Sequence, residues 1–133
     1  MNKAVTFGLI VVTGGIGTAC RAALEAAFPS HGWPWTTFCI NISGAVLLAC
    51  LVEVIAVFGP DNGWRRLVRL GAGTGLLGGF TTYSTFSVET VNLMKSGDLW
   101  LGATYALGSV LLGVALAFTA GRLLARLLRK AAG

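Results

Sequence analysis

Long apolar runs alternate with short polar connectors along the chain. Four runs, at residues 4–28, 35–58, 64–94 and 99–124, are each long enough to cross a hydrocarbon core of roughly 30 Å, which takes about 20 helical residues. The connectors FPSHGWPW, FGPDNGW and KSGD carry the proline, glycine and polar residues typical of turns. We therefore predict an all-α fold with four transmembrane helices in a single domain that covers residues 1–133.

The composition is that of a membrane protein. Hydrophobic residues make up 55% of the chain and charged residues only 11%, far from the balance of a soluble globular domain. Amphipathic indole rings favour the headgroup layer of a bilayer. All four tryptophans lie at predicted helix ends: Trp33, Trp35, Trp64 and Trp100.

The first apolar run also resembles a secretory signal cleaved before Cys20. Gly17, rather than a large aliphatic residue, stands three positions before that cysteine, and the run is long for a signal, so we expect an uncleaved helix. Cys20, Cys39 and Cys50 lack metal-binding spacing, so we expect buried, reduced thiols.

Positive charge is unevenly distributed. With four spans, the N-terminus, the second connector and the C-terminal tail share one side, which carries eight of the ten cations: Lys3, Arg65, Arg66, Arg69, Arg122, Arg126, Arg129 and Lys130. The positive-inside rule then places both termini in the cytoplasm, and we expect the inner (plasma) membrane. The tail RLLARLLRK predicts an amphipathic continuation of the fourth helix at the lipid surface, rather than a nucleic-acid site.

Glycines in the third run have a packing interpretation. The stretch GTGLLG at residues 73–78 matches the G-x-G-x-x-G dinucleotide pattern, but that motif needs a preceding strand, and here a membrane helix begins instead. Gly71, Gly75 and Gly79 recur every four residues. Such a stripe of small residues predicts the close approach of another helix.

The stretch GGFTTYSTF, residues 78–86, predicts a break near the middle of the third run, because paired glycines weaken a helix and hydroxyls compete for backbone hydrogen bonds. A break at membrane depth leaves carbonyls that something buried must satisfy. A hard cation such as Na⁺ would do so. One chain offers too few carbonyls for a full shell, which points to two copies on a symmetry axis.

Polar and aromatic residues beside the break point to an anion path. Tyr83 and Phe86 share a helical face, and the positive edges of their rings can contact a small anion without trapping it. Glu53 and Glu89 lie nearer helix ends, where they can be solvated, and Arg21 either attracts anions or pairs with Glu25. Intramembrane polar groups are functional suspects, and five can donate hydrogen bonds: Asn41, Ser84, Ser87, Tyr105 and Ser109.

Together these residues resemble the small fluoride channels called Fluc, or CrcB-like, proteins. The resemblance covers essentially the whole chain and rests on GxxxRxxL at residues 17–24, NxxG at 41–44 and, above all, GGFTTYSTFSxE at 78–89. It implies a fluoride-selective channel rather than an enzyme. It also implies an antiparallel, dual-topology dimer in the bilayer, with a structural Na⁺ on its two-fold axis.

The resemblance assigns roles residue by residue. The backbone carbonyls of Gly78 and Thr81 look like the Na⁺ ligands, and Asn41 looks like a pore donor to fluoride. Tyr83 and Phe86 stand where the family commonly has two phenylalanines lining the pore, so Tyr83 is a departure. The remaining candidates are Ser84, Thr85, Tyr105 and Ser109 for the polar track, and Glu89 with the vestibule arginine Arg21 for the pore mouth.

Alternatives remain open on assembly and on function. Because dual-topology chains carry little charge bias, the eight-to-two distribution is compatible either with a homodimer or with a heterodimer formed with an oppositely inserted homologue. A proton-coupled small multidrug exporter would need an intramembrane carboxylate, and residues 4–19 have none. A non-transporting assembly protein would explain the glycine stripe but not the break. Passive export of cytoplasmic fluoride is the simplest hypothesis.

Overall fold

The computed structural model describes residues 3–132, and every regular element in that range is a helix. Their bounds are α1 Lys3–Ala27, α2 Trp35–Val57, α3 Gly63–Val68, the π-helix η1 Arg69–Leu77, α4 Gly78–Phe80, α5 Tyr83–Lys95 and α6 Leu99–Ala132. Three segments are long and apolar enough to cross a membrane: Lys3–Ala27, Trp35–Val57 and Leu99–Ala131. The expected all-α membrane fold is confirmed at this level, while the third apolar run is divided into shorter pieces.

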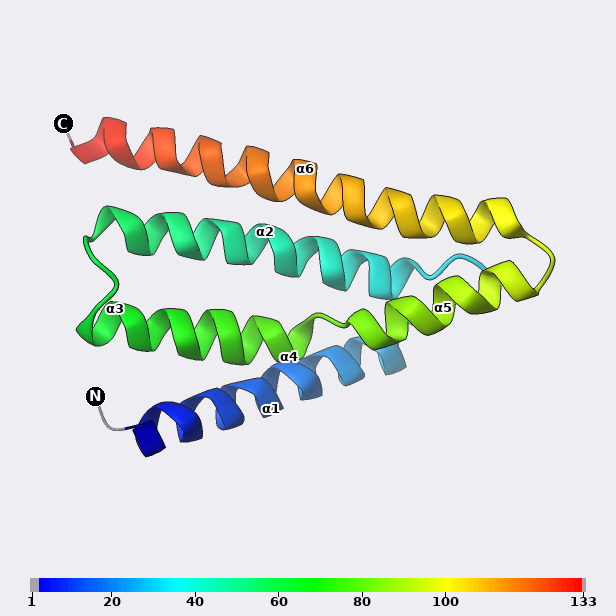
Figure 1. The fold of residues 1–133 in the computed structure, drawn as a ribbon, viewed down its shortest axis with the longest axis horizontal. Coiled ribbons are helices and arrows are strands. Elements are labelled where there is room, and N and C mark those ends of the chain that lie inside the picture. Colours follow the sequence, from blue (N-terminus) through cyan, green and yellow to red (C-terminus); the bar gives the residue numbers. More distant parts are fainter. Residues whose placement is uncertain (1–2, 133) are drawn as a thin grey trace.

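The helices lie roughly along one direction (Figure 1). The three pieces α3, η1 and α4 follow one another beside α2, and α5 continues toward the far end after an interruption. The start of α1, the end of α6 and the connector between α2 and α3 lie at one end of the bundle, as the sequence predicts. The segments that carry the eight cations assigned to one side, namely the start of α1, α3 with the start of η1, and the last turns of α6, therefore lie toward that end.

The interruption falls at Thr81 and Thr82. Thr81 has φ −76° and ψ 158°, and Thr82 has φ −142° and ψ 125°, so two extended residues separate α4 from α5. This confirms the predicted break. The preceding π-helix was not predicted: it extends over nine residues and hydrogen-bonds to the fifth rather than the fourth preceding residue, which widens its turns.

The predicted glycine stripe packs against α1. A methyl group on Gly79 would lie 2.2 Å from the carbonyl oxygen of Gly14, and one on Gly75 would lie 1.9 Å from a threonine hydroxyl of α1. Gly71 faces a leucine side chain of the same helix at 3.2 Å. The contact is reciprocal, because a methyl group on Gly17 would lie 2.0 Å from a carbonyl oxygen of η1. Because glycine has no side chain, the glycines of α1 and of the segment from η1 to α4 allow the two backbones to lie close together.

The last helix, α6, is the longest element and packs against α2 and α5. It has 34 residues, which at about 1.5 Å per residue gives a length of about 51 Å. The basic stretch RLLARLLRK continues this helix without interruption (Figure 1). Its end therefore projects beyond the length that a hydrocarbon core needs.

The cysteines are free, as expected, but not all are buried. Cys20 and Cys39 are exposed on the surface of the chain, and Cys50 is intermediate. The expectation of burial is therefore wrong for two of the three. Helical periodicity places these two residues on outward faces, where lipid or another subunit would cover them.

Alanine substitution tests the packing of α1. We expect Gly17→Ala to lower the thermal midpoint of the detergent-solubilised protein, because the added methyl group meets backbone that cannot rotate away; overpacking of this kind costs about 1–3 kcal/mol. Gly15→Ala is the matched control, since nothing lies within 4 Å of its added methyl group. Equal midpoints for the two variants would contradict the described contact.

Candidate functional site

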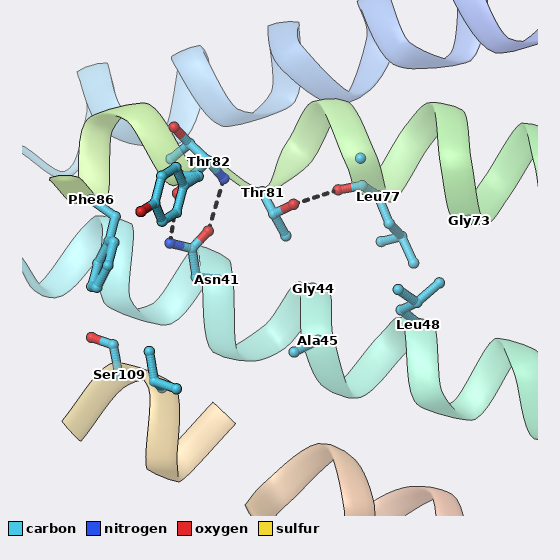
Figure 2. Close-up of a pocket in the computed structure, with 13 residues that line it drawn as sticks. Asn41, Gly44, Ala45, Leu48, Gly73, Leu77, Thr81, Thr82, Phe86 and Ser109 are labelled. Atoms are coloured by element: carbon cyan, nitrogen blue, oxygen red, sulfur yellow. Dashed lines mark hydrogen bonds between the residues drawn. The ribbon is translucent and has the colours of Figure 1, made fainter. Parts of the chain in front are cut away.

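The break opens onto a pocket of about 420 Å³ between α2, the third segment and α6 (Figure 2). Six of the residues singled out from the sequence line it: Asn41, Gly78, Thr81, Tyr83, Phe86 and Ser109. The structure thus brings these candidates together from three separate segments of the chain. The other five, Arg21, Ser84, Thr85, Glu89 and Tyr105, do not line this pocket.

Asn41 holds the break from the side of α2. Its Nδ2 donates to the carbonyl oxygen of Thr82 at 2.9 Å, and its Oδ1 accepts from the Thr82 amide at 2.8 Å (Figure 2). The side-chain amide therefore replaces the intrahelical partners that Thr82 loses. An Asn amide has two N–H donors, so one remains available for a ligand. The expected pore donor is in the first place the residue that fixes the broken backbone.

Gly44 explains the second half of the NxxG motif. It is buried one turn after Asn41, and a methyl group there would lie 2.3 Å from Cγ2 of Thr81. Asn41 and Gly44 lie on one face of α2, because residues three apart are helical neighbours. The asparagine anchors the break, and the glycine lets it approach the helix.

The carbonyl groups of the break fall into two sets. The carbonyl of Gly79 accepts from the Thr18 hydroxyl at 3.3 Å and lies 3.5 Å from Nε of Arg21. Within residues 3–132, no hydrogen bond reaches the carbonyl oxygens of Gly78 and Thr81, because the Thr82 amide goes to Asn41 and the Thr85 amide to the Thr82 hydroxyl. Two oxygens that prefer a donor or a cation therefore remain open.

Thr82 starts α5 and connects the nearby hydroxyls. Its Oγ1 accepts from the Thr85 amide at 3.1 Å, which is an N-cap, and lies 3.0 Å from the Thr85 hydroxyl and 3.3 Å from that of Ser84. Ser84 and Thr85 are thus part of this cap cluster. The sequence indicated Thr82 only as one of the hydroxyl residues that weaken the helix, although a threonine just before a helix is also a recognisable capping signal.

Aromatic rings follow one another from the pocket toward the connector before α2. The ring centroids of Tyr83 and Phe86 are 6.2 Å apart, which confirms that they share a face, and those of Phe86 and Tyr105 are 5.2 Å apart. Trp33 follows, 5.3 Å from Tyr105 and nearly perpendicular to it. Tyr83, at the start of this row, is 81% exposed in the single chain.

Glu89 binds inside the bundle. Its carboxyl oxygens accept from the Thr37 hydroxyl at 2.8 Å and from the Tyr105 hydroxyl at 2.7 Å. Thr37 and Tyr105 are 2% and 0% exposed, whereas Glu89 itself is of intermediate exposure, so its carboxyl group is held by two buried hydroxyl groups. The sequence did not single out Thr37, since no spacing rule links residues on α2, α5 and α6.

Two further candidates have their polar atoms engaged. The Ser109 hydroxyl donates to the carbonyl of Tyr105 at 2.6 Å, although Figure 2 shows the side chain pointing toward Phe86 across the pocket. Arg21 pairs with Glu25 at 3.3 Å, the alternative left open from the sequence. With side chains 20% and 31% exposed, this pair also lies next to the break through the carbonyl of Gly79.

The fold and the site define the class of protein. Apolar helices pack beside a broken segment whose backbone is satisfied by side chains from two neighbouring helices, which is typical of α-helical multi-pass membrane proteins.

Comparison with known proteins identifies the family within this class. The chain matches the family described as CrcB-like protein, Camphor Resistance (CrcB), over residues 8–121, and it belongs to that family. It is 47% identical over 119 residues to fluoride-specific ion channel FluC 1 of Cutibacterium acnes, covering 88% of this chain and 83% of that protein. It is 48% identical over 114 residues to FluC 2 of Leifsonia xyli, covering 85% and 78%. Identity to FluC of Novosphingobium aromaticivorans is 42% over 110 residues, covering 79% and 84%.

Substitution of Asn41 tests its hold on the break. We expect Asn41→Leu to speed amide hydrogen exchange at Thr82 and in the first turn of α5, because the amide loses its acceptor and the carbonyl its donor; an unsatisfied buried group costs about 1–3 kcal/mol. Ser43→Ala, which removes only a hydroxyl bonded within α2, is the control. Unchanged exchange in Asn41→Leu would show that the break is held by other contacts.

Proposed function

We propose that this protein is a fluoride-selective ion channel that lets cytoplasmic fluoride leave the cell passively. The observation that carries the proposal is the pocket at the break, where a free amide donor, aromatic rings and open carbonyls meet inside an apolar bundle. Relatives that are 42–48% identical are named fluoride-specific ion channels. Membership of the same family supports that function here.

Fluoride is small and strongly hydrated, so a selective pore must replace its water with several close donors. The second N–H of Asn41 and the hydroxyl of Tyr83 are donors at the pocket, and the ring edge of Phe86 offers weak positive charge. Further polar groups then continue the path: Ser84, Thr85, Tyr105 and Ser109, with Arg21 and Glu89 toward its mouth. Larger halides would gain less from the same groups.

In this proposal the pocket is one half of a site that a second copy completes. The pocket is open, and Tyr83 at its edge is 81% exposed, which is unusual for a ring in a functional site. Four spans cross the inner membrane: α1, α2, the segment from α3 to α5, and α6. The partner is an antiparallel subunit, either an identical chain or an oppositely inserted homologue, as the charge distribution leaves both open.

The same interface would hold a structural Na⁺. The carbonyls of Gly78 and Thr81 fit a hard cation, since they are oxygen ligands without a hydrogen-bond partner in residues 3–132. Two chains would contribute both pairs. A bound Na⁺ would supply positive charge that offsets the carbonyl dipoles and joins the subunits.

The exporter hypothesis has no comparable support. Proton-coupled export needs an ionisable carboxylate deep in the bundle; residues 4–19 of the first span have none, and the carboxyl group of Glu89 accepts hydrogen bonds from two hydroxyl groups. The family relatives are named channels. Assembly alone would not require an open pocket at the break.

Fluoride efflux from liposomes that contain only this protein tests the function. We expect rapid fluoride loss with no parallel chloride loss, and we expect Phe86→Ile to slow fluoride loss more than about tenfold, a barrier increase of about 1.4 kcal/mol, because the ring edge is lost.

Phe7→Ile is the matched control, since Phe7 is 70% exposed on α1 and lies outside the pocket. Absence of flux from folded protein, alone and with an oppositely inserted homologue, would reject the channel. Normal flux in Phe86→Ile would reject the ring's role but leave the function intact.

Removal of Na⁺ tests the cation site. We expect replacement of Na⁺ by choline at constant ionic strength to lower the thermal midpoint and the dimer fraction, because a ligand at 100 times its Kd stabilises the folded state by about 2.7 kcal/mol. Replacement of chloride by gluconate at constant Na⁺ is the control. A midpoint independent of Na⁺ concentration would argue against a structural Na⁺.

A further inference from the structure

The C-terminal end of α6 carries an exposed cluster of positive charge. Its members, called here the α6 basic face, are Arg122, Arg126, Arg129 and Lys130, and all four are exposed. Spacings of four, three and one residues place them on one side of the helix. Leu123 and Leu127, each 56% exposed, lie on the adjoining side. The end of α6 is therefore amphipathic.

These cations have no acidic partner within residues 3–132. The ion pairs within residues 3–132 are Arg21 with Glu25 and Arg69 with Asp61, and neither involves this face. Glu53 on α2 packs beside Gly121, one residue before the face begins, but forms no ion pair with it. The positive charge is uncompensated within the described chain.

The length of α6 fixes the depth of this face. About 20 helical residues cross the hydrocarbon core, whereas α6 has 34, with the cations confined to the last eleven from Arg122 to Ala132. The Arg122 guanidinium lies 4.8 Å from the centroid of the Phe118 ring, at the boundary between apolar and basic residues. In a bilayer, leucines and cations on adjoining sides of the same helical turns suit the boundary between lipid tails and headgroups.

We propose that the α6 basic face binds the phosphate groups of anionic phospholipids. Arginine guanidinium groups bind phosphate in a two-pronged manner, and three of the four residues are arginine. Clusters of four or more cations beside a membrane helix attract anionic lipid surfaces. The exposed leucines on the same turns favour a phospholipid over free phosphate, because a phospholipid carries acyl chains as well as a phosphate group.

Native mass spectrometry of the full chain in detergent with equal amounts of phosphatidylglycerol and phosphatidylcholine tests this. We expect at least about fivefold preferential retention of phosphatidylglycerol, reduced to near parity when the face is changed by Arg122→Gln, Arg126→Gln, Arg129→Gln and Lys130→Gln together. Lys95→Gln is the control and keeps the preference, because Lys95 is the last residue of α5, and α5 ends at the opposite end of the bundle (Figure 1).

A second measurement holds even if the fourfold variant folds poorly. Raising NaCl from 0.1 to about 0.5 M must weaken phosphatidylglycerol retention by the unaltered chain, because exposed charges are screened. Equal retention of both lipids by the unaltered chain overturns the proposal, as does a preference that survives in the folded fourfold variant. Loss of oligomer rather than of lipid in that variant would assign the face to a second copy instead, and would also overturn it.

Discussion

Backbone groups at a helix break need partners, and in apolar surroundings water cannot supply them. The rest of the site depends on this constraint. Asn41 satisfies both groups of Thr82 from α2, while Thr18 donates to Gly79 from α1. Side chains from α1 and α2 thus stabilise the break between α4 and α5. Within residues 3–132, these side chains leave the carbonyl oxygens of Gly78 and Thr81 without a hydrogen-bond donor.

Small residues make that arrangement possible. An asparagine side chain is short, so it reaches Thr82 only if the break lies close to α2, and Gly44 permits that approach. Gly17 does the same for α1. The glycine motifs and the polar motif therefore serve one purpose: glycines set the distance between backbones, and polar side chains then span it.

Local patterns predicted much of this molecule. The break, the glycine stripe, the shared face of Tyr83 and Phe86 and the Arg21 to Glu25 pair all follow from spacings within one segment. The π-helix and the environment of Glu89 did not follow. The pairing of Glu89 joins residues on three helices, and such register is set by packing rather than by periodicity in the sequence.

Some polar groups at the break have no partner among residues 3–132. Side chains of α1 and α2 hydrogen-bond to the break at Gly79 and Thr82, whereas the pocket keeps an exposed tyrosine ring and, within residues 3–132, two carbonyls without donors. Burying such oxygens against lipid without a hydrogen-bond donor would cost several kcal/mol each. In the proposed function this surface faces a second subunit rather than lipid, which would give the open carbonyls and the exposed ring a polar partner.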